Sequence, residues 1–129
     1  MVEISDIELL ELDDDALDLL IGTAVLAHEL QSKEPSEHDR RSAGRVWFEH
    51  NLDQFRKVIC TSTVIRRIMF SPDASDRDTL FAAVIDTVAV LRGLQAPVAV
   101  VAARLTHYGL DRLCPNVAPP RREPGGLDG

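Results

Sequence analysis

Residues 45–60 read RVWFEHNLDQFRKVIC, and they hold the clearest helical pattern in the chain. An apolar residue recurs every three or four positions, which places one stripe of side chains on one face of an α-helix. That stripe consists of Phe48, Leu52, Phe55 and Ile59. Charged residues recur at steps of four on another face, a pattern that is typical of a solvated, ion-paired surface. We therefore predict a long helix from Ser36 or Arg40 to Cys60.

Similar patterns on either side of this stretch predict further helices. Before it, Leu17, Ile21 and Val25 share one face of a helix that begins near Asp13. After it, we expect a short helix through residues 64–69, a helix from about 76 to 95 and a last helix that begins at Pro97. Prolines mark the breaks between these patterns, because proline cannot continue a helix. The prolines are Pro35, Pro72, Pro97 and Pro115.

The fold class predicted from these patterns is all-α, since no stretch alternates at period two for long enough to predict a strand. We expect a compact bundle of about five helices over residues 13–114. An acidic segment, residues 1–12, precedes the bundle. A tail rich in proline and glycine, residues 115–129, follows it, and its composition predicts disorder.

The bulk composition limits the classes of function. The chain has 129 residues and 45% hydrophobic residues, which fits one soluble domain and excludes a disordered protein. Its net charge is -7, so its overall field does not favour nucleic acid or an anionic membrane. The start of the chain lacks the basic residues and apolar run of a signal peptide. With 12 arginines and 2 lysines, the composition is typical of a GC-rich, bacterial genome.

Acidic residues are concentrated at the start of the chain. Residues 1–20 hold eight acids and no base, so the other 109 residues carry a net charge of +1. Isoleucines and leucines alternate with these acids, and such a segment can bind a basic, apolar groove. The groove can belong to another protein or to this chain itself, and the sequence leaves both alternatives open. The candidate partner-binding acids are Glu8, Glu11, Asp13, Asp14, Asp15 and Asp18.

Asp13, Asp14 and Asp15 also have a purely structural interpretation. They directly precede a helical pattern, where an aspartate caps the first turn and complements the positive end of the helix dipole. Gly22, in the middle of the same pattern, is expected to weaken that helix by about 1 kcal/mol relative to alanine.

A group of basic residues supports an alternative function. It spans Arg40 to Arg67, and its candidate binding residues are Arg41, Arg45, Arg56, Arg66 and Arg67. Such a patch can bind nucleic-acid phosphates, but no aromatic residues are interleaved with it to stack on bases. Direct binding of nucleic acid is therefore the weaker alternative.

The sequence contains no constellation that predicts catalysis, a metal site or a cofactor. None of the four histidines follows a glutamate by three residues, so the motif of a di-iron bundle is missing. The pair His28-Glu29 begins a zinc-protease pattern, but Ser32 stands where the second histidine is required. Cys60 and Cys114 follow apolar residues, and we interpret both as small core hydrophobes in a reducing, cytoplasmic setting.

Asp86 lies within an otherwise apolar helical pattern, and its environment is left open. If it were buried it would need a basic partner such as Arg66, Arg67 or Arg104. We favour an exposed position, since aspartate is rarely fully buried.

These observations favour a non-enzymatic protein-interaction module or an accessory subunit of a bacterial cytoplasmic complex. Its expected partner is another protein with a basic, apolar groove, and a homo-oligomer is left open. A small nucleic-acid-associated or regulatory protein that uses the Arg40–Arg67 patch is the alternative, and an enzyme with an unrecognised site is a third. We expect no membrane association and no cofactor.

Overall fold

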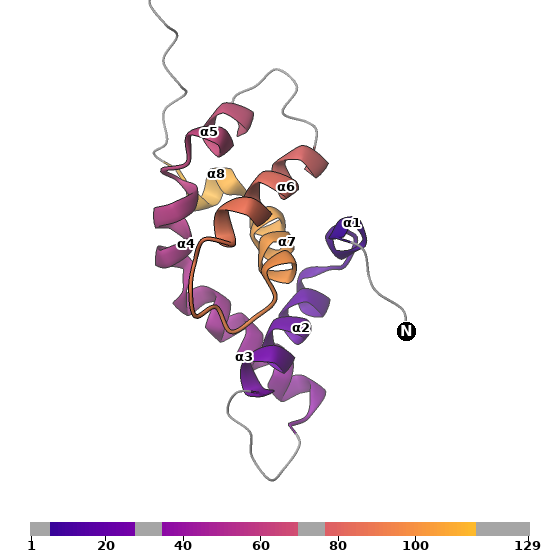
Figure 1. The fold of residues 1–129 in the computed structure, drawn as a ribbon. Helices are drawn as coiled ribbons and strands as arrows, with labels where there is room; N and C mark the ends of the chain where they lie inside the picture. Colours follow the sequence, from indigo (N-terminus) through magenta and orange to yellow (C-terminus); the bar gives the residue numbers. More distant parts are fainter. Residues whose placement is uncertain (1–5, 28–34, 70–76, 116–129) are drawn as a thin grey trace, which may run out of the picture.

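The computed structural model describes residues 6–27, 35–69 and 77–115, and within these ranges the chain forms eight α-helices and no strand (Figure 1). The all-α prediction is therefore confirmed. The predicted disordered tail falls almost wholly on residues 116–129, which lie outside the described residues. The helices are α1 (Asp6–Leu10), α2 (Asp14–Ala27), α3 (Glu37–His50), α4 (Leu52–Ile59), α5 (Thr63–Met69), α6 (Arg77–Val88), α7 (Val98–Tyr108) and α8 (Leu110–Leu113).

The number of helices exceeds the predicted five for two reasons. The short helices α1 and α8 were not predicted as helices of the bundle, and the long predicted helix is divided at Asn51 into α3 and α4. The Asn51 side chain donates a hydrogen bond from Nδ2 to the Trp47 carbonyl at 2.8 Å, which ends α3. The Asn51 carbonyl in turn accepts from the Phe55 amide at 3.1 Å and begins α4. The apolar stripe continues across this break, because Phe48, Phe55 and Ile59 are all buried.

Short polar side chains cap three of the helices, as their sequences indicate. Asp13 Oδ1 accepts from the Ala16 amide at 2.8 Å at the start of α2. Ser36 Oγ accepts from the Asp39 amide at 3.0 Å, and Ser62 Oγ accepts from the Ile65 amide at 3.2 Å. Each cap satisfies a backbone N–H that has no partner within its own helix.

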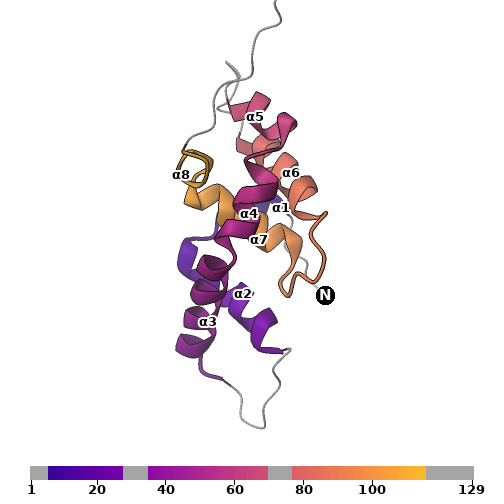
Figure 2. The ribbon, with the colours of Figure 1, turned by 90° about the vertical axis from the view of Figure 1, so that its left-hand side faces the viewer.

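Helix α7 forms the centre of the core. Its residues 100–105 are all buried, and it packs against α1, α2, α6 and α8. Helices α4 and α5 pack on α6 (Figure 1), and α2 and α3 form a hairpin at one end of the molecule (Figure 2). In the described part of the chain, none of the helices is long and apolar enough to cross a membrane.

The α2–α3 hairpin is packed backbone against backbone at two glycines. A Cβ atom built on Gly22 would lie 1.6 Å from the Arg40 carbonyl oxygen, and one built on Gly44 would lie 1.8 Å from the Asp18 carbonyl oxygen. Residues 18 and 22 therefore face 44 and 40, so the two helices run antiparallel. The predicted weakening of α2 by Gly22 considered only helix propensity, whereas the fold needs this glycine for the close contact.

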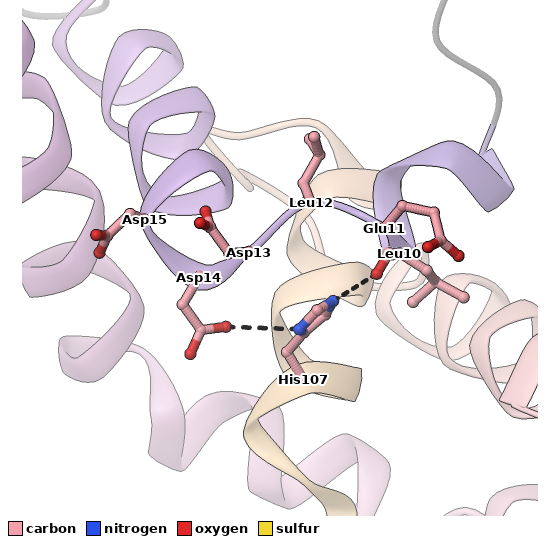
Figure 3. Close-up of a pocket in the computed structure, with 7 residues that line it drawn as sticks. All are labelled: Leu10, Glu11, Leu12, Asp13, Asp14, Asp15 and His107. Atoms are coloured by element: carbon pink, nitrogen blue, oxygen red, sulfur yellow. Dashed lines mark hydrogen bonds and ion pairs between the residues drawn. The ribbon is translucent and has the colours of Figure 1, made fainter.

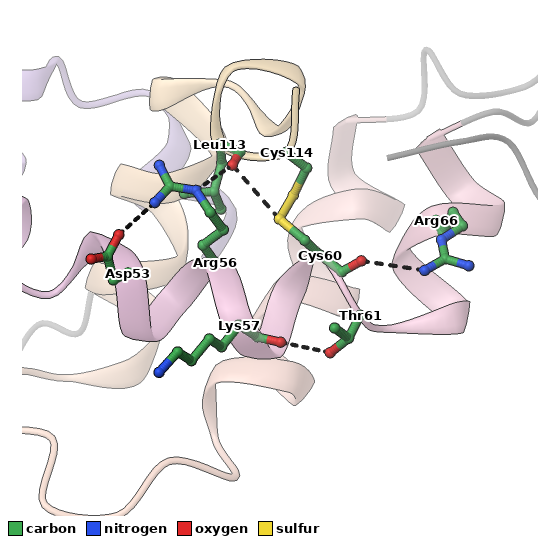
Figure 4. The surroundings of a disulfide bond; sticks show 8 residues. All are labelled: Asp53, Arg56, Lys57, Cys60, Thr61, Arg66, Leu113 and Cys114. Atoms are coloured by element: carbon green, nitrogen blue, oxygen red, sulfur yellow. Dashed lines mark hydrogen bonds and ion pairs between the residues drawn. A yellow bond between two sulfur atoms is a disulfide. The ribbon is translucent and has the colours of Figure 1, made fainter. Parts of the chain in front are cut away.

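The two cysteines form a disulfide, so the prediction that they are unlinked is wrong, although Cys114 belongs to the core and Cys60 packs against it as expected. The Cys60 and Cys114 Cα atoms lie 5.5 Å apart, although 54 residues separate them in the sequence. Helix α8 causes this proximity, because it turns the chain back after α7 and brings Cys114 beside the end of α4 (Figure 4). Spacing in the sequence could not show this turn.

We predict that Gly22→Ala and Gly44→Ala each lower the free energy of unfolding by about 2 kcal/mol or more, because the added methyl group meets backbone atoms that cannot rotate away. The loss occurs although alanine is the better helix former by about 1 kcal/mol. Urea denaturation followed by circular dichroism measures it. Ser42→Ala, at an exposed position of α3, is the control and is expected to leave stability within about 0.5 kcal/mol. Equal stability of all three variants would contradict the close packing.

Candidate functional site

The candidate site is an open pocket of about 590 Å³ where α1, the start of α2 and the end of α7 meet (Figure 3). Its lining combines acidic residues with two leucines and one histidine. The lining residues are Leu10, Glu11, Leu12, Asp13, Asp14, Asp15 and His107. Most of the acids that the sequence singled out are therefore gathered at one place, together with the leucines that alternate with them.

A buried ion pair fixes α2 to α7 beneath this pocket. Arg104 Nε donates to Asp18 Oδ1 at 2.8 Å, and the side chains are 10% and 1% exposed. The second carboxylate oxygen of Asp18 has no hydrogen bond, but it lies 3.5 Å from Arg45 Nε on α3. One aspartate thus links α2 to both α3 and α7.

Arg104 is held by two further contacts. Its Nη1 lies 3.7 Å from Asp14 Oδ1, and its guanidinium carbon lies 4.4 Å from the centre of the Phe48 ring. A guanidinium that stacks on an aromatic face is attracted by the ring electrons. Its N–H groups point outward in the plane of the guanidinium, so they can still donate hydrogen bonds. These contacts compensate for removing the arginine from water.

His107 joins α7 to the connection between α1 and α2. Its Nε2 lies 2.8 Å from the Leu10 carbonyl oxygen, which can only accept, so Nε2 carries the hydrogen and donates it. Its Nδ1 faces Asp14 Oδ1 at 3.7 Å (Figure 3). Both ring nitrogens thus face groups of the chain itself, which gives His107 a positioning role in the pocket wall.

The acids of the predicted partner-binding set fall into two groups. Asp18 is buried and serves the interior, although the prediction placed it with the surface acids. Glu8, Glu11, Asp13, Asp14 and Asp15 are exposed, and all of these except Glu8 line the pocket. The Asp15 side chain is 67% exposed and lies 3.3 Å from Arg45, and the Asp14 side chain is 52% exposed.

A second, smaller depression of about 350 Å³ continues this surface toward α3. Asp13 and Asp15 line both hollows, and Glu37 and Arg41 form the far wall of the smaller one. Glu37 pairs with Arg41 and Asp15 pairs with Arg45, each at 3.3 Å. The exposed acids Glu11, Asp13 and Asp15 line the pocket, and two of them, Asp13 and Asp15, also line the smaller depression. We call these three residues the acidic surface.

The arginines of the predicted basic patch are distributed along three successive helices, and most have partners within the chain. Arg45 lies against Asp15 and Asp18, so part of the acidic start of α2 docks on this chain's own basic residues. Arg41 pairs with Glu37, and Arg56 pairs with Asp53 at 2.6 Å. Arg66 donates to the Cys60 carbonyl at 3.4 Å, and Arg67 is exposed. Acidic residues pair with Arg45, whose side chain stays 49% exposed, and this pairing reduces the positive charge that the patch could offer to nucleic acid.

No pattern in the sequence indicated that Arg104 and His107 position the acids of α2. Arg104 was considered only as a partner for Asp86, but Asp86 is exposed, as favoured, and Arg104 binds Asp18. His107 carried no motif, and His38 and His50 are exposed, while His28 lies outside the described residues. Over the residues that the structure describes, no group of three or more histidine, cysteine, aspartate or glutamate side chains could hold a metal ion.

The chain has no significant match among protein-family models, curated protein sequences or solved structures.

We predict that Asp18→Asn lowers the free energy of unfolding by about 3 kcal/mol, because it leaves the Arg104 charge buried without its main partner. Asp15→Asn is the matched control: the same change three residues earlier, at an exposed ion pair, is expected to cost less than about 1 kcal/mol. Urea denaturation of the two variants beside the wild type gives both values. A similar loss for the two would show that Asp18 does not hold α2 to α7.

Proposed function

We propose that this chain is a non-enzymatic protein-interaction module or accessory subunit of a bacterial cytoplasmic complex, and that it binds a basic segment of its partner at the acidic surface. The observation that carries the proposal is the division among the acids of the α1–α2 region. Asp18 is buried in a structural ion pair, while Glu11, Asp13 and Asp15 are exposed at the pocket, and Asp13 and Asp15 also line the smaller depression.

The partner's chemistry follows from the pocket lining. Exposed carboxylates favour lysine or arginine side chains, and the partly buried Leu12 offers apolar contact beside them, whereas Leu10 belongs to the core. A basic segment with one or two apolar residues matches both features. Charge complementarity of this kind speeds the encounter and makes binding sensitive to salt.

Binding is favoured over catalysis by how the reactive groups are used. A cysteine nucleophile needs a free thiol, but Cys60 and Cys114 are bonded to each other. His107 donates to a backbone carbonyl and faces Asp14, so its ring is engaged by the fold. The carboxylates that line the pocket are exposed to solvent, so a partner can reach them.

The cytoplasmic part of the proposal meets one physical constraint. Disulfides persist in oxidising compartments, and in a reducing cytoplasm they are usually transient or redox-sensing. A cytoplasmic module with a Cys60–Cys114 bond therefore has to tolerate reduction of that bond.

We predict that the combined variant Glu11→Gln, Asp13→Asn, Asp15→Asn loses the partner. Asparagine retains the helix cap at position 13, and Asp14 is left unchanged because it contacts Arg104 and His107. Affinity capture from the native host identifies proteins that bind the wild type, and titration with the purified partner at two salt concentrations measures the effect. We expect affinity to fall about tenfold or more at low salt, and less at high salt.

The matched control neutralises three exposed acids elsewhere, with Glu49→Gln, Asp78→Asn and Asp86→Asn in one chain. It changes the net charge equally and is expected to keep the wild-type affinity. The proposal fails if the two triple variants bind the partner alike, since net charge alone would then explain binding. It also fails if the wild type captures no specific protein.

A further inference from the structure

The disulfide joins the ends of two helices that are otherwise in limited contact. Cys60 is the C-cap of α4, and Cys114 is the C-cap of α8 (Figure 4). Helix α8 has four residues and follows Gly109, whose φ of 99° is a conformation that favours glycine. A short helix after such a residue can change its direction by rotation at one position.

Besides the disulfide, α8 is held by the burial of its two leucines and by one hydrogen bond from α4. Leu110 and Leu113 are buried, and Arg56 Nε donates to the Leu113 carbonyl at 2.8 Å. The Arg112 guanidinium lies 4.2 Å from the centre of the Tyr108 ring, a contact within one short stretch of chain. Isolated helices of this length are not stable, so α8 depends on these attachments.

The rest of the core does not depend on α8. The α2–α3 hairpin is held by the contact at Gly22 and Gly44, and α2 is held to α7 by Asp18 and Arg104. Helices α6 and α7 pack directly on each other. These contacts do not pass through the disulfide, so they remain available when the bond is broken.

The surroundings of the bond favour thiol–disulfide exchange. Cys60 is half-buried whereas Cys114 is 5% exposed, which makes Cys60 the more accessible half. Guanidinium groups bind the carbonyls on both sides of the bond: Arg56 at Leu113 and Arg66 at Cys60. Arg56 is also paired with Asp53 at 2.6 Å, so Arg66 supplies the positive charge beside Cys60, and positive charge near a sulfur stabilises the thiolate that exchange produces.

We propose that Cys60 and Cys114 form a reversible redox clamp, in which reduction of the disulfide releases α8 from α4. A thiol reductant supplies the two electrons, either one dithiol such as dithiothreitol or two molecules of glutathione. One reductant thiolate attacks the Cys60 sulfur, the bond to Cys114 breaks, and Cys114 leaves as a thiolate that takes up a proton. The second reductant thiol then displaces Cys60, so the reductant becomes a disulfide and the protein gains two thiols. This proposal does not depend on the acidic surface.

Hydrogen exchange on the whole, folded protein tests the clamp, with and without dithiothreitol. The amides of Leu113 and Cys114, which donate to Gly109 and Leu110 in α8, are expected to exchange about tenfold faster or more after reduction. The amides of Val101 and Leu105 in α7 are expected to change less than about twofold. The double variant Cys60→Ser, Cys114→Ser is expected to show the exchange pattern of the reduced protein without any reductant. The control variant Arg67→Gln keeps the bond and is expected to show the exchange pattern of the oxidised protein.

A second measurement asks whether a cellular reductant suffices. Mass spectrometry after alkylation counts the thiols formed when the folded protein is incubated with reduced glutathione, which leaves structural disulfides intact. We expect two thiols per chain and restoration of the bond by oxidised glutathione. Resistance to glutathione would overturn the proposal. So would unchanged exchange in α8 on reduction, or loss of protection throughout α7, which would make the bond a structural requirement. The exchange of the wild type, which is reduced only after folding, decides the outcome independently of the serine variant.

Discussion

The backbone contact between α2 and α3 at Gly22 and Gly44 is the constraint on which the other features depend. Without side chains at these positions, the Asp18 carbonyl lies against Gly44 and the Arg40 carbonyl lies against Gly22. The short distance between the two helices places Arg45, the residue after Gly44, next to Asp15 and Asp18. Asp18 then extends to Arg104, so the close contact at one end of the molecule also orients α7.

The ion pair beneath the pocket explains why neighbouring acids serve different purposes. Asp18 lies one turn after Asp14 and shares its side of α2, so both contact Arg104. Asp13 and Asp15 fall on other sides of the helix and stay in water, where one caps the helix and both line the hollows. Buried ion pairs add little net stability, but they fix geometry when their partners are complete. Here the geometry determines which carboxylates a partner can reach.

Much of the helical architecture follows from the sequence, because apolar spacing and capping residues act locally. The stripe through Phe48, Phe55 and Ile59 predicted a buried helical face, and Asp13 caps its helix as its position indicated. Contacts between distant segments could not be predicted in this way. Nothing near Asp18 shows that Arg104, 86 residues later, is its partner, and nothing in the spacing of Cys60 and Cys114 shows that α8 turns back. Gly22 was predicted to weaken its helix because helix propensity does not take the contact with the neighbouring helix into account.

The covalent link between Cys60 and Cys114 also divides the chain mechanically. It encloses 54 residue steps, including α5, α6, α7 and α8, in a closed ring, while α1, α2, α3 and α4 lie outside it. Tension applied at the two ends passes through the sulfur atoms and bypasses the ring. About 180 Å of extensible chain is therefore sheltered from stretching. While the sulfur atoms remain joined, the helices that can unfold under load are those before Cys60, α1 to α4.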